Sequence, residues 1–195
     1  MLGLMQDWPL TVDRILDHAN ACFPHREVVT RSLEGPITRM TYSAIWRRAK
    51  RVTNALKARG VGVGDRVATL AWNTERHMEV WYGAMSMGAV LHTVNPRLFP
   101  EQIAWIANHA EDKALFFDTT FTPIVEKIAS QLPSVKFYVA LTDREHLPKA
   151  NIPNLIAYED FIAGHAPDAA WGGFKCDTAL SAPVTLTDGI VFAGA

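Results

Sequence analysis

The sequence predicts an α/β fold: an open, largely parallel sheet with flanking helices, plus a small antiparallel hairpin near the N-terminus. Residues 60–98 have the pattern turn, strand, helix, turn, strand, which is typical of a right-handed βαβ unit. The alternation of strand-like and helix-like runs continues to residue 141, as in domains built on a parallel sheet. Before this unit, two β-prone runs flank Gly35-Pro36, a pair that favours a turn.

Length, composition and charge narrow the class of protein. A chain of 195 residues with 49% apolar and 20% charged residues is long enough for one well-buried domain. A net charge of -1 gives no electrostatic reason to expect a nucleic-acid partner. We expect a cytoplasmic protein, because the start lacks the basic and apolar regions of a signal peptide and no run is long enough to span a membrane. Cys22 and Cys176 are far apart and are expected to be reduced thiols.

The first elements follow from apolar spacing and turn residues. Residues 10–22 predict an amphipathic helix ended by Phe23-Pro24. Its inward positions are Ile15, Leu16 and Ala19, and its outward positions are Asp13 and Asp17. Residues 27–31 and 37–41 then predict the two strands of the hairpin.

The spacing predicts a longer helix over residues 42–59, capped by Thr41 or Ser43 and ended by Gly60. Its buried stripe consists of Ile45, Ala49, Val52 and Leu56. Its basic residues are Arg47, Arg48, Lys50 and Arg51. We interpret them as a solvated helix face rather than a phosphate or nucleic-acid site, because no aromatic residues for base stacking lie among them.

The βαβ unit itself contains a strand over residues 66–71, a helix capped by Asn73 or Thr74, and a second strand over residues 90–94. The helix is expected to end at Gly88, and Asn95-Pro96 to break the second strand. The predicted core-facing positions of this helix are Met78, Trp81, Tyr82 and Met85.

The remaining elements continue the alternation. Helices are predicted from Pro100 and from Thr122, and buried strands over residues 114–117 and 137–141. Residues 143–153 are polar and rich in proline, which indicates a surface loop, and residues 155–158 form at most a short edge strand. We assign the prominent aromatic residues to the core rather than to a pocket: Trp46, Trp72, Trp81, Trp105, Phe116 and Phe117.

No single motif identifies a chemistry. Gly60, Gly62 and Gly64 are spaced somewhat like a dinucleotide fingerprint, but a helix precedes them and a strand follows, which reverses the required order. The seven histidines show no zinc-ligand spacing, and no G-x-S-x-G nucleophile motif occurs. His92, inside an apolar strand, is interpreted as a hydrogen-bonded structural histidine, with a ligand contact as the alternative.

Taken in order, several runs resemble the amino-terminal part of adenylate-forming (AMP-binding) enzymes, most of all medium- and long-chain fatty-acyl-CoA synthetases. The resemblance covers residues 8–179. The runs that carry it are MTY at 40–42, GDRVA at 64–68, MGAV at 87–90, VLHTVNPRL at 90–98 and IANHAED at 106–112.

The resemblance implies a two-step ligase that uses ATP, Mg²⁺ and CoA: a fatty acid becomes an acyl-adenylate and then an acyl-CoA thioester. It divides the chain into an incomplete α/β domain, residues 1–179, and a divergent tail, residues 180–195, without the Pro-Lys-Gly loop that grips the ATP phosphates in the family. We therefore expect no adenylation by this chain alone, and no catalytic or metal-binding residue can be assigned. A frameshift, a truncation and a deliberate fragment all fit, and the length of the fatty acid cannot be read.

One family contact maps onto this chain. The loop after the second strand of the βαβ unit lies near the nucleotide end of CoA in related enzymes, which implies a CoA contact at Asn95, Pro96 and Arg97. The alternative is a loop arginine that packs against the sheet edge. Two other functions stay open: a non-catalytic module that binds CoA or forms a homo-oligomer through its sheet edge, and a flavodoxin-like binder of small ligands.

Overall fold

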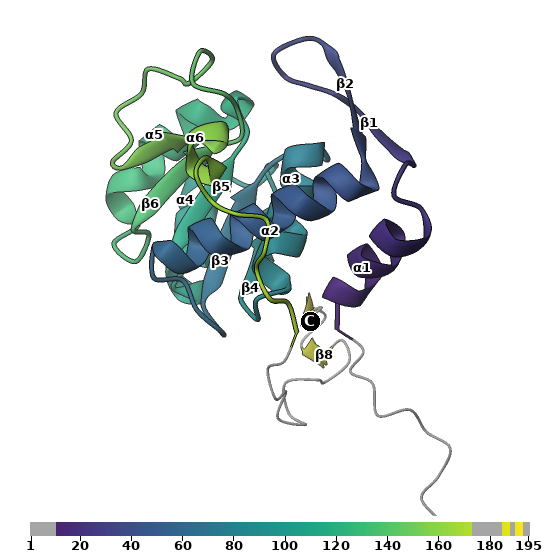
Figure 1. The fold of residues 1–195 in the computed structure, drawn as a ribbon. Helices are drawn as coiled ribbons and strands as arrows, with labels where there is room; N and C mark the ends of the chain where they lie inside the picture. Colours follow the sequence, from purple (N-terminus) through teal and green to yellow (C-terminus); the bar gives the residue numbers. More distant parts are fainter. Residues whose placement is uncertain (1–10, 173–184, 188–189, 193–195) are drawn as a thin grey trace, which may run out of the picture.

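The computed structural model describes residues 11–172 and the strands at residues 185–187 and 190–192. Its centre is a five-stranded sheet in the order β4-β3-β5-β6-β7, and all four pairings are parallel. This arrangement confirms the predicted fold class (Figure 1). The strands are β3 (Arg66–Leu70), β4 (Val90–Thr93), β5 (Ala114–Phe117), β6 (Phe137–Ala140) and β7 (Leu155–Ala157).

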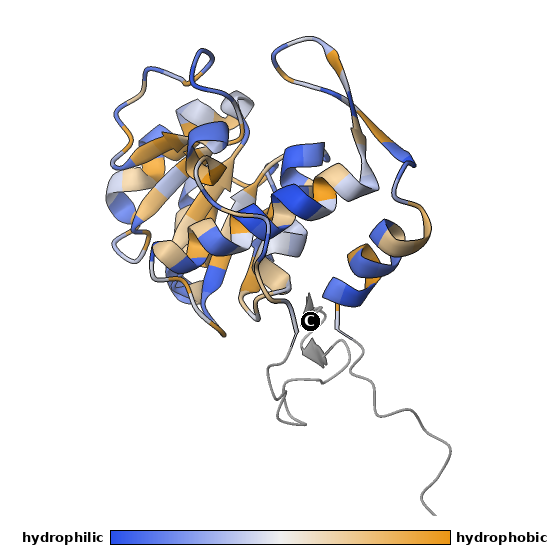
Figure 2. Cartoon of the chain, viewed as in Figure 1, coloured by the Kyte–Doolittle hydropathy of each residue, from blue (hydrophilic) through white to orange (hydrophobic). Residues whose placement is uncertain are grey.

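Helices cover both faces of this sheet. The helices are α1 (Asp13–Cys22), α2 (Tyr42–Ala58), α3 (Glu75–Met85), α4 (Pro100–Ala110), α5 (Thr122–Ile128) and α6 (Tyr158–Ile162). Val52 of α2 and Phe161 of α6 pack with Phe116 on one face, whereas Ile103 of α4 packs with Phe117 on the other. Figure 2 shows the resulting pattern, with hydrophobic strands inside and hydrophilic stretches on the outer helices. No helix in the described part of the chain is long and apolar enough to cross a membrane.

The predicted hairpin is formed by β1 (Glu27–Arg31) and β2 (Ile37–Thr41), which pair antiparallel and stand apart from the main sheet (Figure 1). Its strands are mostly exposed, and Thr30 is their one buried residue. The loop that joins them reaches back toward the main sheet, where it contributes to the site described below. A second small pair, β8 (Thr185–Thr187) and β9 (Ile190–Phe192), lies in the predicted tail.

Helix α2 follows its predicted pattern closely. Thr41 accepts a hydrogen bond from the Ala44 amide, and Ile45, Val52 and Leu56 are fully buried. Gly60 ends the helix with a φ of +77°, a conformation that favours glycine, and the Val61 amide donates to the Leu56 carbonyl.

The orientation predicted for α1 is wrong at two positions. Asp13 is only 1% exposed, whereas Ile15 is 62% exposed. The segment that ends at Gly172 passes close to the carboxylate of Asp13, so a distant part of the chain covers the first turn of this helix. Helical spacing identifies an apolar stripe but not what packs over the other positions.

The predicted core face of α3 is wrong at Trp81, whereas Met78 and Tyr82 pack against the core as predicted. Trp81 is exposed, and the most buried positions include His77, Glu79 and Gly83. The cause is a close approach to α2: a Cβ on Gly83 would lie 2.6 Å from the Cβ of Val52. The Thr53 hydroxyl also donates to the Gly83 carbonyl at 2.6 Å. Glycine is needed here because the two backbones nearly touch.

The aromatic residues divide into three groups, of which the half-buried Trp46, packed against the core, forms one. Phe116 and Phe117 of β5 are fully buried, which confirms their assignment to the core. Trp72, Trp81 and Trp105 have exposed fractions of 46%, 42% and 66%, so their assignment was wrong. Each lies at an element end or on an outer helix face, where neighbouring elements cover it only in part: Trp72, for example, contacts the ring of Phe121 on one side.

Candidate functional site

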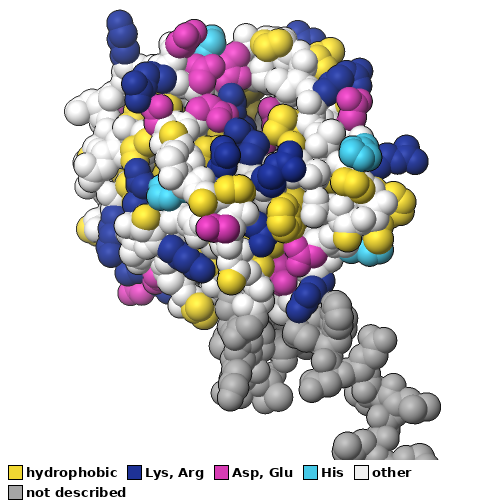
Figure 3. Space-filling view, viewed as in Figure 1, with side chains coloured by type: hydrophobic (Ala, Val, Ile, Leu, Met, Phe, Trp, Pro, Cys, Tyr) yellow, Lys and Arg dark blue, Asp and Glu magenta, His cyan; other side chains and the backbone are white. Residues whose placement is uncertain are grey.

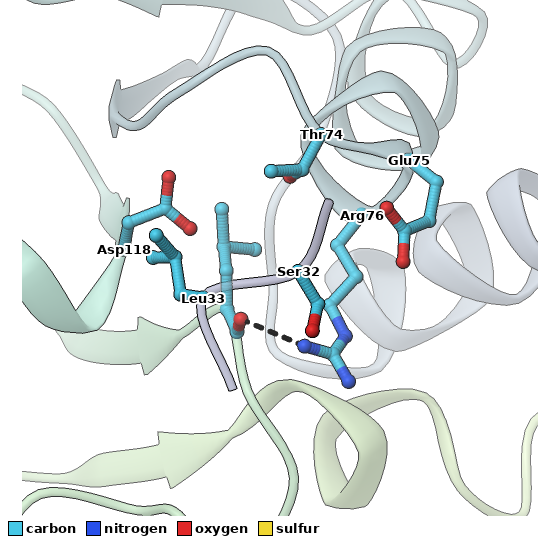
Figure 4. Close-up of a pocket in the computed structure, with 7 residues that line it drawn as sticks. Ser32, Leu33, Thr74, Glu75, Arg76 and Asp118 are labelled. Atoms are coloured by element: carbon cyan, nitrogen blue, oxygen red, sulfur yellow. Dashed lines mark hydrogen bonds between the residues drawn. The ribbon is translucent and has the colours of Figure 1, made fainter. Parts of the chain in front are cut away.

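The strand order reverses between β3 and β5, and β6 lies next to β5. The carboxyl ends of these three strands are therefore neighbours at one edge of the sheet. Open α/β sheets commonly bind ligands in the crevice at such a switch point. In this chain the hairpin loop and the first turn of α3 enclose a small cavity of about 10 Å³ there (Figure 4). It is lined by Ser32, Leu33, Thr74, Glu75, Arg76, Asp118 and Leu141.

Arg76 is the central cation of this corner. Its guanidinium donates to the Glu34 carboxylate at 2.7 Å, to Glu159 at 3.0 Å and to the Leu141 carbonyl at 3.1 Å; Figure 4 draws the last of these. Burial opposes its charge, but the two carboxylates outweigh burial and raise the pKa of Arg76. Its donors are therefore committed to the protein's own groups.

Glu34, at the tip of the hairpin, binds this arginine and also the end of β6. Its carboxylate also accepts from the Thr142 hydroxyl at 2.6 Å, at the end of β6. Partial burial would raise the pKa of Glu34, but the bonds from Thr142 and Arg76 lower it, so the carboxylate is held ionised. The hairpin is thus tied over the switch point by hydrogen bonds and an ion pair.

Asp118 follows β5 directly and is 1% exposed. Its carboxylate accepts a hydrogen bond from the Trp72 amide just after β3. Burial raises the pKa of Asp118 to about 6, and the neighbouring Glu34 and Glu75 carboxylates add to this. An ATP phosphate tail needs available cations and backbone donors. This corner offers carboxylates and Arg76, whose donors are already hydrogen-bonded within the protein, so it does not fit an ATP phosphate tail.

A second ionic cluster joins α2, α3 and α6. Arg48 donates to Glu79 at 2.8 Å and to Glu159 at 2.9 Å, and the Tyr158 hydroxyl donates to Glu79 at 2.6 Å. Glu79 is fully buried; burial raises its pKa to about 7, although Arg48 and Tyr158 act to lower it. These bonds satisfy polar groups that would otherwise be costly to bury.

This cluster corrects the interpretation of the basic face of α2. Arg47 is exposed as predicted, but Arg48 is largely buried in ion pairs. Lys50 donates to the Ala169 carbonyl and lies over the rings of Trp46 and Trp171. Figure 3 shows basic and acidic side chains next to one another on this face, rather than a patch of one sign. The absence of a phosphate or nucleic-acid role remains a prediction.

Two histidines of the βαβ unit are held in hydrogen bonds. The indole nitrogen of Trp81 can only donate, so the His77 Nε2 that lies 3.1 Å from it must accept, and Nδ1 carries the proton toward the Trp72 carbonyl at 2.9 Å. Burial lowers the pKa of His77, consistent with a neutral ring. His92 Nδ1 lies 2.8 Å from the buried Asp112 carboxylate, which confirms that this histidine is hydrogen-bonded within the fold.

The loop predicted to contact CoA lies at the edge of the sheet, after β4. The Asn95 side-chain oxygen accepts from the Arg97 amide at 3.0 Å, which closes a tight turn. Asn95 and Arg97 are exposed and Pro96 is half-buried. Within residues 11–172, the Arg97 guanidinium makes no ion pair, in contrast to Arg76.

Sequence reasoning missed the switch-point residues, although a signal was present. Asp118 directly follows a buried strand, and Thr74 to Arg76 begin the helix after the neighbouring strand. Parallel strands bring such positions to one edge. The role of Glu34 had no comparable signal, since its partner Thr142 is 108 residues away. In the described part of the chain, no group of three or more His, Cys, Asp or Glu side chains could hold a metal ion.

Comparisons with known proteins address the family. Residues 16–168 match the family model of the AMP-binding enzymes. The chain is 41% identical over 181 residues to the 3-methylmercaptopropionyl-CoA ligase of Ruegeria lacuscaerulensis, which covers 93% of this chain and 34% of that protein. It is 40% identical over 193 residues to the long-chain-fatty-acid–CoA ligase of Thermus thermophilus, covering 96% of this chain and 34% of the relative.

Solved structures agree on the fold. A fatty acyl CoA synthetase of Mycobacterium tuberculosis superposes with a TM-score of 0.63 at 22% identity, over 82% of this chain and 29% of that one. The chain spans about a third of the length of the curated relatives it matches. The match over residues 16–168 and the identity of about 40% to two CoA ligases lead to one conclusion: the chain belongs to the AMP-binding enzyme family.

Proposed function

We propose that this chain forms the amino-terminal α/β part of an ATP-dependent acyl-CoA ligase, with residues 1–179 as that domain and residues 180–195 as a divergent tail. The reaction joins a carboxylic acid to CoA through an acyl-adenylate, with release of AMP and pyrophosphate. The observation that supports this most is the identity of about 40% to CoA ligases over nearly the whole chain. A fatty acid is the proposed substrate class, and the cytoplasm the proposed location.

The length of the acid is not part of the proposal. Relatives named for 3-methylmercaptopropionate, medium-chain and long-chain fatty acids are 41%, 41% and 40% identical to this chain. This segment therefore does not favour one of these acids over the others.

We further propose that the chain alone does not adenylate an acid. The switch-point corner has carboxylates and committed donors, and residues 180–195 lack a lysine, an arginine or a Pro-Lys-Gly sequence. Without positioned cations and donors around the phosphates, little stabilises the transition state. ATP and Mg²⁺ are thus cofactors of the proposed complete ligase.

For CoA, we propose a contact at Asn95, Pro96 and Arg97. The turn closed by Asn95 leaves the Arg97 side chain exposed and without an ion pair among residues 11–172, so it is available to a phosphate. This contact supports a second candidate function, a non-catalytic module that holds CoA. An oligomer formed through the sheet edge belongs to that candidate as well.

A segment exchange tests the proposal. Residues 16–168 replace the corresponding segment of the Thermus ligase, and acyl-CoA formation is measured with acids of several lengths. The proposed function predicts that the chimera keeps ligase activity, whereas the 195-residue chain alone shows neither pyrophosphate exchange nor thioester formation. A folded but inactive chimera, or an active isolated chain, would contradict it.

The same chimera tests the CoA contact. Arg97→Ala is expected to raise the KM for CoA about threefold to tenfold and to leave acid-dependent pyrophosphate exchange unchanged, because only the second step uses CoA. Arg47→Ala, which changes another exposed arginine, on α2, is the matched control. An unchanged KM for CoA would remove the contact from the proposal.

A further inference from the structure

Two residues that line the switch-point cavity have buried polar atoms without a hydrogen-bond partner in the described structure. The Ser32 hydroxyl and the Oε2 atom of Glu75 are both buried and have no hydrogen-bond partner in the described structure. Ser32 is 9% exposed and Glu75 is 6% exposed. The other carboxylate oxygen of Glu75 accepts from the Thr38 hydroxyl at 2.9 Å, which fixes the side chain in place.

These two atoms come from two different segments that line the cavity. Ser32 lies in the loop of the hairpin, and Glu75 lies in the first turn of α3 (Figure 4). The cavity has a volume of about 10 Å³, close to the lower limit for one water molecule. A buried carboxylate oxygen without a donor is costly, so a donor of this size is strongly favoured there.

We propose that this cavity is a binding site for one water molecule, which donates to Glu75 Oε2 and forms a second hydrogen bond with the Ser32 hydroxyl. The lining residues Thr74 and Asp118 supply further polar atoms, and a buried water usually makes two to four such bonds. The bridge ties the hairpin loop to α3 beside the Glu34–Arg76 ion pair.

A water fits the site better than a cation does. A hard cation takes about six or more oxygen ligands. No group of three or more acidic, histidine or cysteine side chains suited to a metal exists among the residues that the structure describes. Arg76 already lines the cavity as a positive charge.

The water has a consequence for ligand binding. The hairpin loop, the other lining residues and one water together fill the switch point. The place where doubly wound sheets usually bind a ligand is then closed. This inference does not depend on the proposed ligase function.

The direct test is a high-resolution crystal structure of the 195-residue chain. The proposal predicts a density peak about 2.7–3.2 Å from both Ser32 Oγ and Glu75 Oε2. A direct Ser32–Glu75 hydrogen bond, or a cavity without density, would overturn it.

A double-mutant cycle in solution gives a second test. Ser32→Ala and Glu75→Ala are combined, and the unfolding equilibrium constant is measured for all four proteins. A shared water predicts a coupling of about fivefold or more, since the lost Thr38 bond of Glu75 cancels in the cycle. Additive effects would contradict the bridge.

Ser134→Ala is the matched control. Its hydroxyl is also buried and without a partner in the described structure, but it does not line this cavity, so its cycle with Glu75→Ala should be additive. The cycle is repeated with choline chloride in place of sodium chloride. A water predicts no change, whereas loss of the coupling without sodium would replace the water with a cation.

Discussion

Two places along the sheet's carboxyl edge, the switch point between β3 and β5 and the turn after β4, differ in whether their arginine is bound by the protein's own polar groups. At the switch point, Arg76 binds Glu34 and Glu159, and the hairpin loop closes the corner. After β4, the short turn of Asn95 leaves Arg97 exposed, with no ion pair among residues 11–172. Both places contain an arginine, Arg76 in the first turn of α3 and Arg97 in the turn after β4, yet only the second is available to an anionic ligand. Availability of the charge, rather than its position in the fold, indicates where this domain would bind one.

The largest expected effect comes from breaking the closed corner. Arg76→Ala leaves the Glu34 and Glu159 carboxylates without their shared partner, and Glu34 is only 11% exposed. We expect a loss of about 2–3 kcal/mol in the free energy of unfolding, which is lower than for a fully buried pair because Glu159 reaches solvent. Urea unfolding measures this loss, and a loss below about 0.5 kcal/mol would show that the corner is not closed by this arginine.

The next effect concerns pH. The pKa of Asp118 in the folded chain is about 6, above its value near 3.9 in an unfolded chain. The folded state therefore keeps a proton that the unfolded state loses, so this contribution to stability is full below about pH 4 and is lost as the pH rises through 6. Compared with Asp118→Asn, the wild type should lose about 2 kcal/mol between pH 4 and pH 7. Parallel pH profiles of the two proteins would show that Asp118 has an ordinary pKa.

A smaller effect is expected from changing Glu34, which ties the hairpin to Arg76 and Thr142. Glu34→Gln keeps the size of the side chain but removes the charge that Arg76 and Thr142 hold, at an expected cost of about 1 kcal/mol. Because the hairpin buries little apolar surface, we expect faster amide exchange in β1 and β2 and unchanged exchange in β5. Equal changes in the hairpin and in β5 would mean that the hairpin opens only with the whole domain.

The smallest effect on stability is expected at the open corner. Arg97→Ala removes an exposed side chain that makes no ion pair within the described residues, so the free energy of unfolding should change by less than about 0.5 kcal/mol. Urea unfolding beside Arg76→Ala measures the contrast between the two arginines. A loss similar to that of Arg76→Ala would show that Arg97 is also committed to the fold.

The sequence predicted what local patterns determine. The stripe of α2, its Thr41 cap and the parallel strands depend on spacing and on turn residues close in the chain. It did not predict which polar residues are buried, because their partners are distant: Arg48 and Glu159 are 111 residues apart. The burial of Glu79 on α3 was missed for the same reason, since it depends on Tyr158 and Arg48. The sequence runs that resemble AMP-binding enzymes identified the family, whereas spacing and single motifs did not.

The measurement that tests the contrast between the two corners most directly is a calorimetric titration of the 195-residue chain with CoA and, separately, with ATP and Mg²⁺. The account predicts that CoA binds, that Arg97→Ala weakens this binding about threefold to tenfold while Arg47→Ala does not, and that ATP gives no saturable binding. Saturable ATP binding that Arg76→Ala abolishes, or CoA binding that does not change with Arg97→Ala, would contradict it.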